Sequence, residues 1–130
     1  MREGNRKGTN ASMLYELRSY DIDPERLDGY LEWANTRAMP ILMGQFGFRV
    51  TGFWHAIETS EGPAPETNVH WIIAWESEAE MKERWAIARA SDEWKAAMAE
   101  TLDPEQPNGR KYHRVVQSKL LAPIPASPLQ

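Results

Sequence analysis

The sequence predicts an α+β fold with the element order β-α-β-β-α-β and a four-stranded antiparallel sheet. Residues 14–34 read as an extended stretch that ends in Tyr20 and continues into an acidic helix start. Residues 69–88 repeat this strand-then-helix design, with a tryptophan in the place of the tyrosine. Strand-like runs follow each helix, at residues 48–57 and 111–121. The 130 residues are enough for one domain with a real core and too few for two.

The first strand, residues 13–20, leads into a helix whose beginning and irregularity can both be predicted. Asp23 is a good N-cap, and Pro24 suits the first helical position because its missing N–H has no intrahelical partner there. Pro40 falls inside the same helix and is expected to kink it or to loosen the preceding turn. The buried side is expected to be an apolar stripe at helical spacing, made of Leu27, Tyr30, Leu31, Ala34, Ala38 and Ile41.

The second half of the chain is predicted to form a hairpin, a second helix and the last strand. Residues 48–57 and 68–75 are rich in β-branched and aromatic residues and read as strands joined by a polar loop. Ser77 and Glu80 form a capping box, in which each side chain is expected to accept the other residue's backbone N–H. Ser91 then restarts a short helix before the last strand.

Both ends of the chain are predicted to lie outside the folded domain, which covers residues 13–121. Residues 1–12 are polar and show no periodicity, so we expect a disordered tail. Residues 122–130 contain three prolines, which exclude a central strand or a helix and predict an extended arm.

Composition excludes several classes of protein and of site. The formal charge of −4 argues against a nucleic-acid partner, which calls for a basic face. No apolar run approaches the roughly 20 residues that cross a bilayer. Residues 1–12 lack the apolar core of a secretory signal, so we expect a cytoplasmic location. The absence of cysteine excludes disulfides, thiolate ligands and a thiol nucleophile.

Several segments resemble those of NIPSNAP-family domains, in the same order along the chain. Residues 13–20, Met-Leu-Tyr-Glu-Leu-Arg-Ser-Tyr, are similar to the family's opening strand. Residues 52–54, Gly-Phe-Trp, resemble its second strand, and residues 90–94, Ala-Ser-Asp-Glu-Trp, resemble its last helix. Residues 117–128 resemble its closing segment. The resemblance covers about residues 13–128.

This resemblance implies a ferredoxin-like domain that pairs with a second copy into a dimeric α+β barrel, so a homodimer is expected. It implies no particular reaction. The wider superfamily contains cofactor-independent monooxygenases, isomerising enzymes and haem enzymes, and a fold alone does not choose among them.

Strand alternation gives an expectation for the two faces of the sheet. In the first strand, Tyr15 and Leu17 are apolar and are expected to face the helices. Glu16, Arg18 and Tyr20 would then face the opposite side, which the partner covers. Charged residues on a buried surface suggest a cavity lining, although Glu16 and Arg18 could equally form a structural ion pair between strands.

The candidate site residues follow from this expectation. Arg18 or Arg49 would stabilise an enolate or carboxylate, with Glu16 beside Arg18, and His55 or His70 would move a proton. The pocket wall and the substrate contacts are predicted to come from Tyr20, Arg49, Phe53, Trp54 and Trp71. Trp85 and Trp94 sit at helical core spacing and need no ligand, whereas Trp33 is expected to be partly exposed. The three histidines show no spacing typical of a metal site, so no metal and no cofactor are expected.

Three functional classes remain open at this level. The first is a barrel that binds a small apolar or aromatic molecule, with an activity like that of a cofactor-independent monooxygenase or an isomerase. The second is a non-catalytic protein-interaction module. The third is a haem-binding barrel, which requires a histidine that projects inward as an axial ligand.

Overall fold

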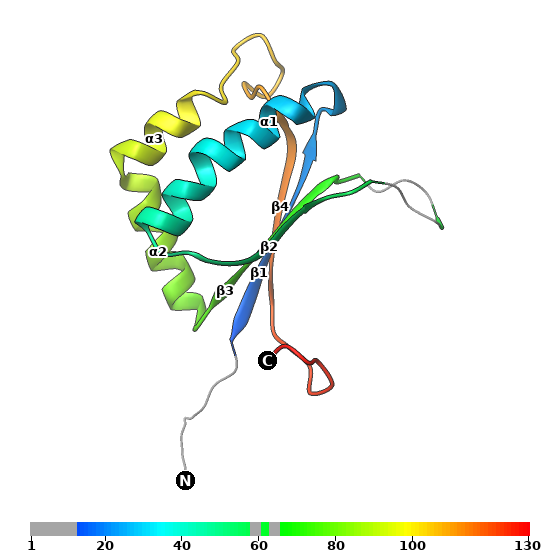
Figure 1. The fold of residues 1–130 in the computed structure, drawn as a ribbon, viewed down its shortest axis with the longest axis vertical. Helices are drawn as coiled ribbons and strands as arrows, with labels where there is room; N and C mark the ends of the chain where they lie inside the picture. Colours follow the sequence, from blue (N-terminus) through cyan, green and yellow to red (C-terminus); the bar gives the residue numbers. More distant parts are fainter. Residues whose placement is uncertain (1–12, 58–60, 63–65) are drawn as a thin grey trace.

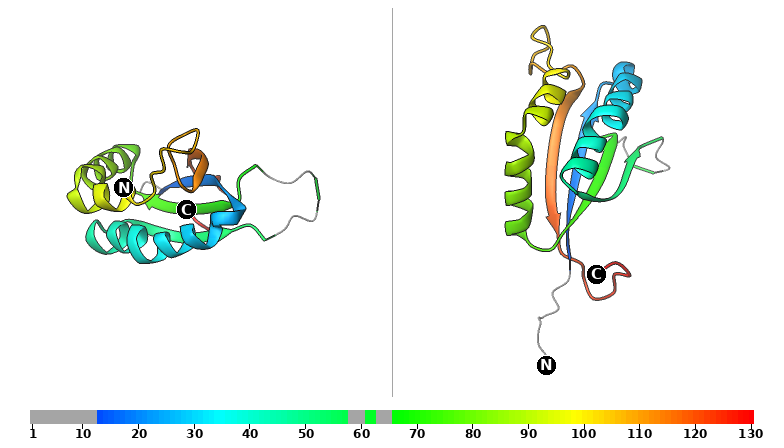
Figure 2. Two further views of the ribbon diagram at one scale, coloured as in Figure 1. Left: turned by 90° about the horizontal axis from the view of Figure 1, so that it is seen from above. Right: turned by 60° about the vertical axis from the view of Figure 1, so that its left-hand side comes forward.

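The computed structural model describes residues 13–57, 61–62 and 66–130, so the tail predicted at residues 1–12 lies outside the described part of the chain. Four strands form one sheet in the order β2-β3-β1-β4, and all neighbours are antiparallel. The helices lie together on one side of this sheet (Figures 1 and 2). The predicted α+β order is therefore confirmed. The strands are β1 (Leu14–Ile22), β2 (Arg49–His55), β3 (Val69–Trp75) and β4 (His113–Leu121).

The first helical segment is irregular in the region of Pro40, as predicted. It comprises η1 (Pro24–Arg26), α1 (Leu27–Trp33) and two π-helical stretches, η2 (Ala34–Ala38) and η3 (Pro40–Gln45). Pro40 has no N–H to give to the α-helical ladder. The amides on either side of it instead reach back five residues, from Met39 to the Ala34 carbonyl and from Phe46 to the Ile41 carbonyl.

The predicted caps are present, one of them in a modified form. The Asp23 carboxylate accepts the Glu25 amide at 3.0 Å, at the start of η1. Before α2 (Glu78–Ala90), the Ser77 hydroxyl accepts the Glu80 amide at 3.0 Å. The Glu80 carboxylate, however, accepts the Glu76 amide at 2.7 Å, one residue before the amide that a capping box predicts. Ser91 then caps α3 (Asp92–Ala99).

The assignment of the β1 side chains to the two faces was wrong. Arg18 is directly opposite Trp71 in the ladder, and such pairs share a face in an antiparallel sheet. Glu16 lies on that face too, and it accepts a hydrogen bond from Trp85 of α2, so this is the face that the helices cover. Glu16 is only 3% exposed. The charge of Glu16 suggested an outward-facing side chain, but its carboxylate accepts hydrogen bonds from Arg18 and from the indole N–H groups of Trp75 and Trp85 inside the core.

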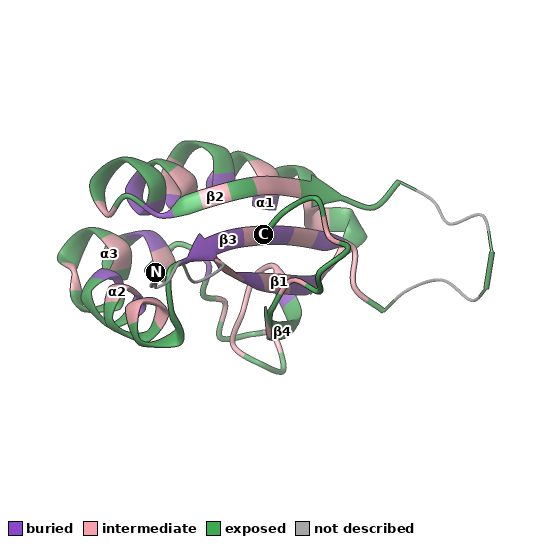
Figure 3. Cartoon of the chain, turned by 90° about the horizontal axis from the view of Figure 1, so that it is seen from below, coloured by how far each residue is buried: buried purple, intermediate pink, exposed green. Residues whose placement is uncertain are grey.

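The opposite face of the sheet is not covered by helices. Tyr15 on this face is nevertheless buried, and its hydroxyl donates to the backbone carbonyl of Gln130 at 3.1 Å, because the C-terminal arm folds back at the end of the sheet where β1 begins (Figure 1). Burial follows the sheet order: the central strands β1 and β3 are mostly buried, whereas the edge strands β2 and β4 are mostly exposed (Figure 3).

Candidate functional site

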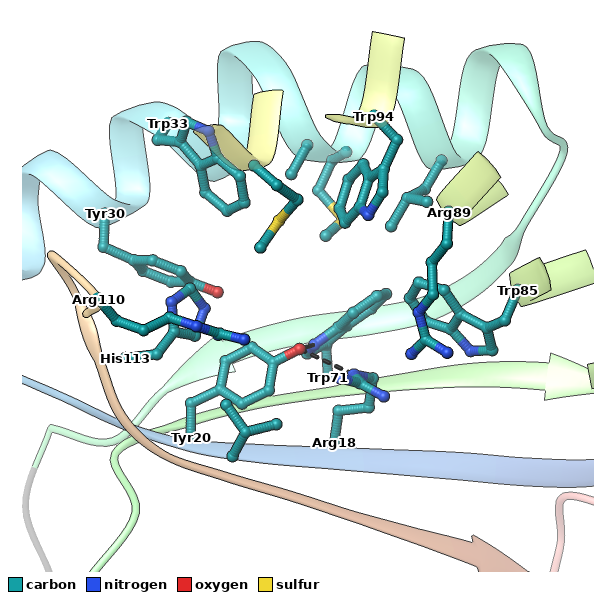
Figure 4. A pocket seen from close by; sticks show the side chains of 15 residues that line it. Arg18, Tyr20, Tyr30, Trp33, Trp71, Trp85, Arg89, Trp94, Arg110 and His113 are labelled. Atoms are coloured by element: carbon teal, nitrogen blue, oxygen red, sulfur yellow. Dashed lines mark hydrogen bonds between the residues drawn. The ribbon is translucent and has the colours of Figure 1, made fainter. Parts of the chain in front are cut away.

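A cavity of about 140 Å³ lies between the sheet and the helices. Its walls are mainly aromatic and come from β1, β3 and all the α-helices (Figure 4): Tyr20, Tyr30, Trp33, Trp71, Trp85 and Trp94. An engineered protein cavity of about 150 Å³ binds benzene, so this space suits a single ring with small substituents. Val116 at the β4 edge is 44% exposed and also lines the cavity, which places an opening to solvent on that side.

The Glu16 carboxylate anchors the polar side of the cavity. One of its oxygens, Oε1, accepts hydrogen bonds from the indole N–H groups of Trp75 at 3.0 Å and Trp85 at 2.8 Å. The other, Oε2, accepts from Arg18 Nη1 at 2.9 Å and from Ser118 at 3.2 Å. With both oxygens occupied by protein donors, Glu16 has little capacity left for a ligand. We therefore interpret Glu16 as a positioning residue that holds Arg18 and Trp85 in place.

Arg18 in turn orients Tyr20. The hydroxyl oxygen of Tyr20 accepts Arg18 Nε at 2.8 Å and Trp71 Nε1 at 2.9 Å (Figure 4). Burial alone would lower the pKa of the Arg18 guanidinium, but its interactions with Tyr20 and Glu16 raise the pKa above its ordinary value. Within the described part of the chain nothing accepts the hydroxyl hydrogen of Tyr20. That hydrogen is therefore available to a molecule in the cavity.

Two further polar groups face the cavity without a partner in the described residues. Figure 4 shows the hydroxyl of Tyr30 pointing inward, and burial raises the pKa of this hydroxyl, so it remains a neutral donor. His113 is 6% exposed, and its buried Nδ1 makes no hydrogen bond. Burial, followed by the charges of Arg110 and Arg18, lowers the pKa of His113 to about 4. The imidazole is therefore neutral at pH 7, with a polar atom that a ligand can satisfy.

The structure brings together only some of the candidate residues that the sequence indicated. Arg18, Tyr20 and Trp71 line the cavity, and Glu16 lies directly behind Arg18. The ring of Phe53 packs 6.1 Å from that of Trp71.

The other candidates lie elsewhere. Arg49 pairs with Glu80 at 2.6 Å, at the start of α2. His70 is on the uncovered face of the sheet, where its Nδ1 lies 3.0 Å from the Ser19 hydroxyl. His55 is exposed at the end of β2, and Trp54 is 53% exposed on the uncovered face.

The sequence did not point to the rest of the cavity wall. Trp33 is 8% exposed instead of partly exposed, because its indole N–H donates to the Ala97 carbonyl at 2.9 Å. Trp85 and Trp94, predicted as ordinary core residues, also line the cavity. His113 was missed because both alternating sets of the last strand are mixed in polarity, which left the inward set undecided. A register shift in the β1–β4 ladder next to Ile22, the partner of His113, adds to that ambiguity.

Comparison with known proteins identifies the family. The sequence model of the NIPSNAP family matches residues 15–128. The chain belongs to the NIPSNAP family. No curated protein matches it. Among solved structures, it is similar to a NIPSNAP family protein with unknown function from Agrobacterium tumefaciens, with 23% identity over 92% of this chain and 95% of that chain and a TM-score of 0.72.

Two other similar structures show the same fold. An uncharacterized NIPSNAP-like domain protein from Burkholderia xenovorans has 22% identity and a TM-score of 0.69, covering 92% of this chain and 91% of that chain. A second NIPSNAP family protein from Agrobacterium tumefaciens has 21% identity and a TM-score of 0.69, covering 93% and 94%. At these identities the likeness establishes the fold of this NIPSNAP domain and no activity. In the described ranges, none of its helices is long and apolar enough to cross a membrane.

Proposed function

We propose that this NIPSNAP domain binds one compact aromatic or apolar molecule in the cavity between its sheet and its helices. One observation carries the proposal: aromatic walls surround about 140 Å³, and three polar groups face this space with unused hydrogen-bonding capacity among the described residues, namely the Tyr20 hydroxyl hydrogen, the Tyr30 hydroxyl and Nδ1 of His113. A buried polar group without a partner costs about 1–3 kcal/mol, a cost that a bound ligand removes. Few polar groups in an apolar pocket are typical of small-molecule sites.

The arrangement supports proton transfer without a cofactor, the isomerase-like reaction that the sequence suggested. In this reaction the neutral imidazole of His113 takes a proton from a carbon that lies between a carbonyl group and a carbon–carbon double bond. The negative charge that forms on the substrate offsets the positive charges of Arg110 and Arg18, which otherwise disfavour protonation of His113. The C–H electron pair forms a carbon–carbon double bond, and the carbonyl π pair moves to the oxygen, giving an enolate. The Tyr20 hydroxyl, polarised by Arg18, donates a hydrogen bond to that oxygen. Return of the proton to the far carbon of the original double bond, as the oxygen electron pair re-forms the carbonyl group, shifts the double bond and completes the isomerisation.

The alternative functions have less support. The cavity is smaller than the roughly 300–1,000 Å³ of drug-sized ligand sites, and a haem is at the large end of that range, so His113 has no room to act as an axial ligand. A purely non-catalytic interaction module would not require unpaired polar groups around an enclosed space. The cytoplasmic location remains a prediction from the sequence.

We also infer that two copies of the domain pair through the uncovered face of the sheet. The support for this comes from the family resemblance and from apolar residues on that face, where Trp54 is 53% exposed and Val115 and Leu121 are each 39% exposed. Glu16, Arg18 and Tyr20, which the sequence analysis placed on the face covered by the partner, lie on the helix side instead. The pairing therefore rests on a different set of side chains.

Binding is tested with single-ring compounds (benzyl alcohol, benzamide and benzoate) added to the purified protein. Tryptophan fluorescence is a direct readout because Trp71 and Trp85 line the cavity. Ala38 lines the same cavity, so Ala38→Leu is expected to fill it and abolish binding. The matched control is Ala96→Leu on the exposed side of α3. Failure of all three compounds to bind at millimolar concentration would contradict the proposed function.

A further inference from the structure

The cavity carries more positive charge than the described residues neutralise. The guanidinium groups of Arg18, Arg89 and Arg110 all line it. Arg18 is paired with Glu16, but no carboxylate of the described residues lies within salt-bridge distance of Arg89 or Arg110. The chain as a whole has a formal charge of −4, so this local excess does not reflect a basic protein.

The positive groups raise one another's energy. Burial, followed by the charge of Arg18, lowers the pKa of Arg89. Figure 4 shows the guanidinium groups of Arg18 and Arg89 at the same end of the cavity, close to Trp85. Both lie over that indole ring, at 5.0 Å and 4.6 Å from its centre. The ring offers each cation some attraction, but it does not neutralise either positive charge.

Arg110 places a further positive charge at the other end of the cavity. It lies near His113, and together with Arg18 it disfavours a second positive charge on the imidazole. A negative charge inside the cavity would offset the positive charges of Arg89 and Arg110, and no acidic side chain of the described residues lines the cavity.

We propose that the ligand of this cavity is a compact aromatic anion, a single-ring carboxylate or enolate whose charged group lies between Arg18 and Arg89. This deepens the proposed function, on which it rests, by naming the charge and size of the ligand. The ring lies among the aromatic walls, and the Tyr20 hydroxyl donates to the anion alongside the guanidinium groups. The volume of about 140 Å³ excludes fused-ring and long-chain acids from the cavity as it stands.

The π-helical wall gives the cavity its shape. Ala38, Met39 and Leu42 line it, and they come from η2, from η3 and from the residue between them, where Pro40 widens the helical turns. Such π-helical turns are rare and are frequent at functional sites. A regular α-helix here would present different side chains to the cavity. We infer that this irregular wall sets the size limit for the aromatic ring.

The test compares benzoate with benzamide, which have nearly the same shape and differ in charge. Affinities are measured by calorimetry at pH 7.5 and low salt on the full chain. We expect benzoate to bind about tenfold or more tightly than benzamide, since charge-assisted hydrogen bonds are roughly twice as strong as neutral ones. Arg89→Met keeps the apolar stem of the side chain, and it is expected to remove most of this preference while the protein stays folded.

Lys82→Met is the matched control, because it removes one positive charge from the exposed face of the same helix. It should keep the preference for benzoate. Benzamide binding as tightly as benzoate would overturn the anion proposal and leave the proposed function intact. Equal losses in Arg89→Met and Lys82→Met would also overturn it, because the effect would then be a general field. Binding of neither compound would overturn the anion proposal, and it would overturn the proposed function as well if benzyl alcohol also fails to bind.

Discussion

Arg18→Met should destabilise the protein by leaving the Glu16 carboxylate without its cation. The two side chains are 2.9 Å apart and only 14% and 3% exposed, so water does not replace the lost partner. Breaking a buried ion pair from one side costs about 3–5 kcal/mol. Glu16 keeps three neutral donors, from Trp75, Trp85 and Ser118, which reduces that cost. We therefore expect a loss of about 2–3 kcal/mol.

A double-mutant cycle separates this effect from simple loss of packing. Glu16→Gln keeps one carbonyl oxygen to accept the two indole N–H groups. The glutamine side chain is neutral, so its burial does not require a cation beside it. The double variant Arg18→Met/Glu16→Gln should then be more stable than the sum of the single losses predicts, with a coupling energy of about 1–2 kcal/mol. Stability is measured by urea denaturation at one fixed protein concentration, with tryptophan fluorescence as the probe.

The control for the cycle is Arg114→Met, which breaks an ion pair with Asp21 in which the arginine is 53% exposed. An exposed pair of this kind contributes less than about 1 kcal/mol. If Arg18→Met costs no more than Arg114→Met, or if the single losses of the cycle simply add, the Glu16 carboxylate is not the buried anchor described above.

Three other predictions concern His113, the dimer and the C-terminal arm. The pKa of His113, about 4, lies below its unfolded value near 6.5. The neutral imidazole therefore contributes about 3 kcal/mol to the free energy of unfolding above pH 6.5, relative to its protonated form, and this contribution is lost as the pH falls towards 4. In urea titrations, His113→Gln should flatten this dependence of stability on pH, and an unchanged dependence refutes the assignment. Light scattering should give twice the 14.9 kDa chain mass, and Trp54→Ser should shift the protein towards the monomer; a monomer at micromolar concentration contradicts the pairing. Removal of residues 122–130 should lower the melting temperature more than removal of residues 1–12, because the arm accepts a hydrogen bond from the Tyr15 hydroxyl and the sequence of residues 1–12 has little apolar surface to bury; equal tolerance argues against a docked arm.

The sequence predicted the fold because the signals for its elements are local. The caps at Asp23 and Ser77 and the irregularity at Pro40 each depend on a few neighbouring residues, and the structure contains all three features. The departures are small: β1 runs to Ile22 instead of residue 20, and the Glu80 carboxylate accepts a different amide. Boundaries of this kind depend on the neighbouring strand as well as on the local sequence.

The candidate site was harder to predict because it depends on contacts between distant residues. Alternation correctly groups Glu16, Arg18 and Tyr20 on one face, but it does not say which face meets the helices. The decisive contact joins Glu16 to Trp85, 69 positions apart. His113 enters the wall from the opposite end of the chain and adjoins a register shift. A buried carboxylate that is satisfied by indole N–H groups leaves no local pattern.

The Glu16 carboxylate couples the stability of the fold to the shape of the cavity. It holds Trp75 of the sheet, Trp85 of α2 and the arginine that orients Tyr20, so the same hydrogen bonds stabilise the fold and shape the cavity. A variant at Glu16 or Arg18 therefore changes stability and ligand binding together. Arg89 lies at the exposed end of the same cavity and has no such bonds to the described core. Because of this difference, Arg89→Met reports on ligand charge, whereas the Glu16–Arg18 cycle reports on the fold.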